Sequence, residues 1–179
     1  MTIRARLAVL LAAVTALSLG LIMQTRSNAE SKEKQADPAV ERTRKQVLML
    51  DDLYKSAIVL ITDKYVNDSD DLPAGSAFQA LFAAMKKKGW HEVRLVDATD
   101  APLRPKNAPA DDFEKEAVKR LLEGKAGHEQ IVEKDNKRYL RSATAIPVVL
   151  KKCIMCHPHY EDAKPGQAIG ALSYTILIE

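Results

Sequence analysis

An apolar stripe at helical spacing runs through residues 40 to 65, and it limits the fold more than any other feature. Its members recur mostly at steps of three or four: Val40, Val47, Leu50, Tyr54, Ile58, Ile61 and Tyr65. This spacing places them on one face of an α-helix. Asp37 can cap that helix, and Pro38 is favoured in a first turn. The sequence therefore predicts one long helix that ends at about Val66.

The rest of the chain mixes helices and strands. Residues 73–88 and 111–122 repeat the helical spacing, whereas residues 91–96 alternate and predict a strand. A hairpin is predicted around Asp135-Asn136, from residues 130–134 and 137–146, and residues 168–178 predict a last strand. Because strands do not alternate regularly with helices, a parallel doubly wound sheet is disfavoured. We expect an α+β fold with a small antiparallel sheet. A PAS-like domain fits this order, as do other small sheets.

The first 29 residues have the pattern of a targeting segment. Arg4 and Arg6 precede an uncharged apolar run from residue 7 to residue 23, and Ser27 and Ala29 are spaced for cleavage after Ala29. The run is also just long enough for a membrane anchor. A cleaved signal peptide and a retained anchor are both left open. Either places the body on the periplasmic side of the bacterial cytoplasmic membrane, because the basic residues come first. Residues 30–36 then form a charged tether, and residues 37–179 form the domain.

The charge balance argues against nucleic acid as a partner. Of the 27 Lys and Arg residues, three lie in the first 29 positions, and the remaining 24 equal the 24 Asp and Glu residues. A neutral body lacks the basic footprint of a nucleic-acid-binding protein.

The segment CIMCHPHY, residues 153–160, holds both cysteines and two of the four histidines. A thioredoxin-type dithiol follows an early strand in a βαβ context, which this segment lacks. A structural zinc site needs four converging ligands, and the adjacent Cys156 and His157 point apart in most backbones. A disulfide between Cys153 and Cys156 suits an exported protein but leaves His157 unexplained.

A fourth interpretation uses all three residues, because C-x-x-C-H is the attachment motif of haem c. The thiols of Cys153 and Cys156 can each form a thioether with a haem vinyl group, and His157 can then supply an imidazole nitrogen to the iron. The export segment agrees with this independently, since haem c is attached outside the bacterial cytoplasm. We predict one covalently bound haem c with its iron.

From about Val40 onward the chain resembles the PAS-like c-type haem domains of periplasmic sensor proteins. The likeness lies in QVLMLDDLYKSAIVLITDKYV, GWHEVRLVDAT, DDFEKEAVKRLLEGK, KRYLRSATAIPVV, CIMCH and GQAIGALSYTI. It implies a small antiparallel sheet, a long N-terminal helix and a haem between sheet and helices. It also implies thioether links at Cys153 and Cys156, with His157 as the proximal ligand. Some members use a cysteine as second axial ligand, and this chain has no third cysteine.

The second axial ligand must therefore differ or be missing. Met49 is our first choice, because the family places its second ligand on the N-terminal helices. A methionine that fills the core beside Leu48 and Leu53 is the competing interpretation. Alternatives left open are Met85, His91 and His159. Further candidates are Lys137, Arg138 and Arg141 for the haem propionates, and Tyr54 and Tyr65 for the pocket wall.

Two roles compete for a single external haem. The first is electron transfer, as a periplasmic or membrane-tethered cytochrome or as a haem subunit of a membrane complex. The alternative is redox or gas sensing, which would signal through a partner protein because the sequence contains no recognisable output module. A second copy of the chain, bound along the long helix, is a further candidate partner. Without a paired acid and base around the motif, we expect a carrier or sensor rather than an enzyme.

Overall fold

The computed structural model describes residues 36–68, 73–99, 102–164 and 166–179. Contacts divide the chain into two units, Met1–Asp37 and Pro38–Glu179, and the second unit holds the elements below. The predicted signal or anchor segment and nearly all of the tether lie outside the described residues. Within the described ranges, no helix is long and apolar enough to cross a membrane.

Helices come first along the chain, and most strands follow. The elements are α2 (Pro38–Tyr65), α3 (Ala74–Lys87), β1 (Glu92–Asp97), η1 (Pro105–Asn107), α4 (Asp112–Leu122), β2 (Gly127–Lys134), β3 (Lys137–Pro147), α5 (Lys151–Cys156), η2 (Pro158–Tyr160) and β4 (Ala168–Leu177). The predicted helices and strands are confirmed to within a few residues. The loop expected before α4 contains the short η1.

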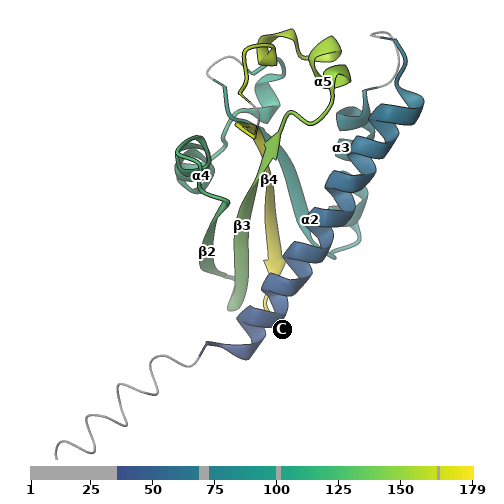
Figure 1. The fold of residues 1–179 in the computed structure, drawn as a ribbon. Coiled ribbons are helices and arrows are strands. Elements are labelled where there is room, and N and C mark those ends of the chain that lie inside the picture. Colours follow the sequence, from purple (N-terminus) through teal and green to yellow (C-terminus); the bar gives the residue numbers. More distant parts are fainter. Residues whose placement is uncertain (1–35, 69–72, 100–101, 165) are drawn as a thin grey trace, which may run out of the picture. The chain divides into compact units, whose positions relative to one another are not determined.

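The strands form one antiparallel sheet in the order β1-β4-β3-β2, which confirms the α+β class (Figure 1). β4 is the last strand of the chain but lies between β1 and β3. The hairpin of β2 and β3 turns at Asp135 and Asn136, which both have positive φ angles, 53° and 58°. Positive φ at both central residues is what a tight type I′ hairpin requires.

Alternation along the strands divides the core between the two faces of the sheet. Leu140, Leu172 and Tyr174 pack against α2 and α3 in the largest apolar cluster. The intervening side chains face α4, where Ala143 packs with Phe113 and Ala171 packs with Leu121. Figure 1 shows the resulting layers, with α2 and α3 on one side of the sheet and α4 on the other. Because successive side chains of a strand point to opposite faces, the sheet presents apolar residues on both faces, and helices cover both.

A buried carboxylate on α2 fastens this helix to the sheet. Oδ1 of Asp51 accepts hydrogen bonds from Tyr174 at 3.0 Å and from Thr144 at 2.6 Å. Its Oδ2 accepts from Lys55 at 2.8 Å. Burial and the Asp51 carboxylate both raise the pKa of Tyr174, so the phenol stays protonated and donates. These bonds fix the position of α2 over β3 and β4.

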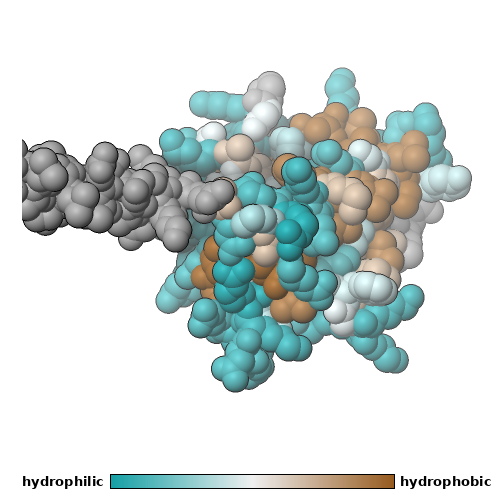
Figure 2. Space-filling model, turned by 90° about the horizontal axis from the view of Figure 1, so that it is seen from below, coloured by the Kyte–Doolittle hydropathy of each residue, from teal (hydrophilic) through white to brown (hydrophobic). Residues whose placement is uncertain are grey.

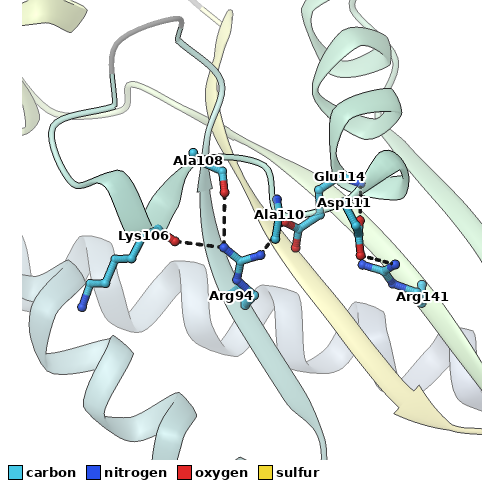
Figure 3. Close-up of polar contacts among 7 residues, drawn as sticks. All are labelled: Arg94, Lys106, Ala108, Ala110, Asp111, Glu114 and Arg141. Carbon is cyan, nitrogen blue, oxygen red and sulfur yellow. Dashed lines mark hydrogen bonds and ion pairs between the residues drawn. The ribbon is translucent and has the colours of Figure 1, made fainter.

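A second polar network fastens α4 and the loop before it to the other side of the sheet (Figure 3). Glu114, only 2% exposed at its side chain, accepts from Arg94 at 2.6 Å and from the main chain of Ala110 at 2.8 Å. Asp111 caps α4 by accepting from the N–H of Glu114 and also pairs with Arg141 at 2.7 Å. Burial opposes ionisation of Asp111, but these two donors prevail and lower its pKa.

Two predicted positions need correction. Tyr65, expected on the buried stripe of α2, is 74% exposed. Leu81, expected on the core face of α3, is exposed, whereas Phe78 and Phe82 are buried. Tyr65 is the last residue of α2 and lies beyond the part of the helix that the sheet covers, so the stripe loses its partner there.

Candidate functional site

The C-x-x-C-H segment forms a short helix followed by a tight turn. α5 carries Cys153 and Cys156 three positions apart, and its first turn is closed by a hydrogen bond from Cys153 N–H to Leu150. His157 ends the helix, and its N–H donates to the carbonyls of Cys153 and Ile154. Positions three apart are neighbours on a helix surface. The backbone thus brings the two cysteine positions and the histidine into one compact unit.

The thiol of Cys153 is half-buried and forms no disulfide. The side chains of Met155, Cys156 and His159 lie outside the part of the chain that the structure describes. Within that part, no group of three or more His, Cys, Asp and Glu residues forms a metal site.

Lys152 fastens α5 to the C-terminal end of α2. Its Nζ lies 2.8 Å from the carbonyl oxygen of Asp63 and 2.8 Å from that of Val66. The last carbonyls of a helix have no partner within the helix, and a cation there also favours the helix dipole. The helix α5 is therefore held against the C-terminal end of α2.

The imidazole of His157 stacks on the ring of Tyr160. Their centroids are 5.1 Å apart and their planes differ by 22°. The buried hydroxyl of Tyr160 donates to Oδ2 of Asp97, at the end of β1, over 3.0 Å. Burial, together with the Asp97 carboxylate, raises the pKa of Tyr160. The histidine thus rests on a ring that is bonded to the sheet.

Half-buried apolar side chains gather between the sheet and α2 at the end where α5 lies. β3 ends at Pro147, a few residues before α5, and Ile146 is at this end of the strand. Ile58, Ile61, Leu95 and Ile146 pack against the main core without being fully buried. On α3, Gly75 lacks a side chain where a Cβ would lie 3.6 Å from Leu95. This end of the core is apolar and incompletely covered.

These residues fit a covalently held haem. Two thiol positions one helical turn apart match two vinyl groups, and the adjacent imidazole matches the iron. Apolar, half-buried side chains suit the faces of a porphyrin, because the hydrophobic shell around such a group controls solvent access.

Met49 is not brought close to this unit. It is 63% exposed on α2 and lies roughly 21 Å of helix before Asp63, at about 1.5 Å per residue. No described contact joins Met49 to α5. Its assignment to the iron therefore remains a prediction.

The other described candidates lie elsewhere in the domain. His91 shares a 2.8 Å hydrogen bond with the hydroxyl of Tyr54, and burial lowers the pKa of His91. Met85 is half-buried on α3, and His128 stacks on Phe113 on the α4 side of the sheet. Arg141 is also on that side, over the ring of Phe113. Lys137 and Arg138 begin β3, at the end of the strand away from α5.

Three residues of the site were missed from the sequence. Lys152 and Tyr160 lie beside the motif, but their partners are far away along the chain. Asp97 stands at the end of a predicted strand, and only the fold brings it to Tyr160. Polar residues next to a C-x-x-C-H motif were the one available signal.

A family model described as Tll0287-like matches residues 13–174, which is most of the chain. That family is a c-type haem-binding family. No curated protein matches the chain.

Proposed function

The chain belongs to the Tll0287-like family and is a haem-binding, cytochrome-like domain; from this premise we propose that it is a mono-haem c-type cytochrome for electron transfer. It would act alone or as the haem subunit of a membrane complex. The observation that carries the proposal is the α5 unit, in which Cys153, Cys156 and His157 follow one another across a single helical turn and its end.

Cys153 and Cys156 would hold the haem by thioethers. Each S–H adds across one vinyl C=C, so that the sulfur bonds one carbon and the proton ends on the other; no oxidant is consumed. His157 would be the proximal iron ligand. A single motif in the chain implies a single haem.

The half-buried residues at the α5 end of the core would contact the porphyrin. With these contacts the haem would lie between the sheet and the helices α2 and α3, as the resemblance to PAS-like haem domains implies. Burial of that kind tunes a haem potential together with the axial ligand and nearby hydrogen bonds. The bound group would supply one-electron chemistry, and the chain would supply its attachment, its iron ligand and a shielded surface.

Sensing is the second candidate role, and the Lys152 contact is what favours it. This residue joins α5 to the carbonyls of Asp63 and Val66 at the C-terminal end of α2, so a movement of α5 would act on the long helix. A sensor would need a partner protein to read that movement. An electron carrier needs a redox partner protein only.

We also propose a location and a further partner. Residues 1–29 would deliver the domain to the periplasmic side of the cytoplasmic membrane, as a cleaved signal or a retained anchor. A second copy could bind along α2, where Met49, Leu53 and Leu60 are exposed at spacings of four and seven. Figure 2 shows hydrophobic surface among hydrophilic residues on the face of the domain seen from below.

The test is an absorption spectrum of the protein made with the haem c maturation machinery, ferric and ferrous, with and without carbon monoxide. Wild type should keep its haem bands after denaturation, and a Cys153→Ala/Cys156→Ala variant should lose them. His157→Ala should retain the haem but change its absorption spectrum. The matched control, His159→Ala, should retain the haem with the spectrum of wild type. A wild type without haem bands would refute the proposal. A spectrum that shifts with carbon monoxide would favour sensing.

A further inference from the structure

Tyr160 joins the attachment segment to the sheet through one hydrogen bond. It is 8% exposed, and its ring lies against His157 with centroids 5.1 Å apart. Its hydroxyl donates to Oδ2 of Asp97 at 3.0 Å, across 63 residues of sequence. The buried phenol of Tyr160 donates to a carboxylate and stacks on the imidazole of His157. It therefore limits how that imidazole can turn.

Asp97 is itself held rigidly. It is 7% exposed, and its Oδ1 accepts from the N–H of Thr99 at 2.8 Å and from the hydroxyl of Thr99 at 2.5 Å. Its backbone belongs to β1 and is in register with Gly170 of β4. Because both carboxylate oxygens have donors, the acceptor for Tyr160 has a fixed direction.

The same pair of residue types occurs once more in the described core, without a histidine. Tyr174 donates to the buried Asp51 at 3.0 Å and serves to fasten α2. This pair shows what a Tyr–Asp bond contributes to stability alone. The Tyr160 pair differs in the imidazole stacked on its ring. It also differs in the further donor to the carboxylate, which is Thr99 for Asp97 and Lys55 for Asp51.

An imidazole bound to a metal through one nitrogen can still rotate about that bond, and the surrounding contacts decide its orientation. Resting on the proposed function, we propose that Tyr160 is a positioning residue that fixes the ring plane of His157, the residue that would ligate the haem iron. We further propose that the buried Asp97 carboxylate, acting through Tyr160, favours the ferric state. A negative charge near the iron stabilises the more positive oxidation state.

Three variants of the haem-loaded protein separate ring, bond and charge. Tyr160→Leu removes the ring, Tyr160→Phe keeps the ring without the bond, and Asp97→Asn keeps an acceptor without the charge. The matched controls lie at the pair without a stacked imidazole: Tyr174→Phe breaks the equivalent bond, and Asp51→Asn removes the equivalent charge. The readouts are the low-temperature electron paramagnetic resonance spectrum of the ferric protein and its reduction potential.

Wild type and Tyr160→Phe should give one set of g-values, whereas Tyr160→Leu should give shifted or multiple sets. Asp97→Asn should raise the ferrous-to-ferric ratio at a fixed potential about tenfold, which is about 59 mV for one electron. The two controls should leave both readouts unchanged, although they destabilise the fold.

Unchanged g-values in Tyr160→Leu would overturn the positioning role. If Tyr160→Leu does not accumulate with haem, the test is the reduction potential of Asp97→Asn. A reduction potential equal to that of Asp51→Asn would overturn the inference. A wild type without covalent haem would refute the proposed function itself. If the protein carries haem but the variants match wild type in g-values and reduction potential, only this inference is refuted.

Discussion

The ammonium group of Lys152 lies 2.8 Å from the carbonyl oxygen of Val66, the residue that follows the end of α2. A second carbonyl, that of Asp63, is equally close. One side chain therefore joins the segment with the haem-attachment motif to the end of the long helix, across 86 and 89 residues of sequence.

Lys152→Met should loosen this junction. Hydrogen bonds from a charged group contribute about 2 kcal/mol, so the free energy of unfolding should fall by about that amount. Amide hydrogen exchange should accelerate in α5. Lys151→Met removes the exposed neighbouring charge and should change the free energy of unfolding by less than about 0.5 kcal/mol. Equal effects of the two substitutions would show that the contact does not hold α5.

Asp51→Asn should be among the most damaging conservative changes in the domain. It leaves Lys55 without its anionic partner in a partly buried site and weakens the bonds from Thr144 and Tyr174. Breaking such a pair costs about 3 kcal/mol, measured as the free energy of unfolding in denaturant. The exposed neighbour Asp52, changed to Asn, is the matched control. A small loss at Asp51 would mean that α2 is held by apolar packing alone.

His91 should make the stability of the domain depend on pH. Burial lowers its pKa in the folded chain, while the unfolded chain keeps the ordinary value near 6.5. Below about pH 6.5 the unfolded chain therefore binds more protons, and the free energy of unfolding falls as pH falls towards the folded pKa. Well above pH 6.5 the imidazole is neutral in both states, so the contribution of His91 is constant there.

His91→Gln can keep a hydrogen bond to Tyr54 and removes this titration. Its free energy of unfolding should fall less steeply between pH 7 and pH 5 than that of wild type (about one unit either side of the unfolded value). His128, whose pKa is lowered by burial and by Arg120, should contribute a separate share. Identical slopes for wild type and His91→Gln would contradict the linkage.

The assignment of Met49 as second iron ligand predicts that Met49→Leu loses the low-spin absorption bands of the haem protein. Leucine keeps the volume and removes the sulfur. Met85→Leu on α3 is the matched control and should keep the bands. A low-spin spectrum that survives in Met49→Leu would place the second ligand elsewhere, in keeping with the 63% exposure of Met49.

A dimer along α2 predicts that Leu53→Asp yields a monomer. Leu53 is 59% exposed and lies between Met49 and Leu60 on the helix. A charge there would be buried in the interface without a partner, and such burial is costly. Sedimentation of wild type and variant measures this. Leu103→Asp, at a similarly exposed leucine outside α2, should leave the mass unchanged. A monomeric wild type would refute the dimer.

Most of the fold was predictable because its signals are local. The stripe from Val40 to Ile61 predicted α2, and the Asp135-Asn136 pair marked the hairpin turn through its tolerance of positive φ. Alternation over residues 91–96 predicted the strand β1, although Val93 and Val96 prove to be buried on opposite faces of it. Each signal depends on residues within a few positions of one another.

The site was predictable only in part, since its supporting contacts are not local. The motif itself singled out Cys153, Cys156 and His157 as candidates. The bond from Tyr160 to Asp97 and the bonds from Lys152 to α2 depend on which strand lies beside which, and no periodicity encodes that. The exposure of Met49 likewise depends on which side of α2 the sheet covers.

The central place of β4 orders the events of synthesis. In the described sheet, β1 and β3 both pair with β4. Yet β4, residues 168–177, is the last of these elements to leave the ribosome. When Cys153 and Cys156 emerge, only the hairpin of β2 and β3 has both of its strands. In a chain that crosses the membrane N-terminus first, as we propose, the two thiols would likewise reach the periplasm before β4, and the sheet would still be open when the thioethers form.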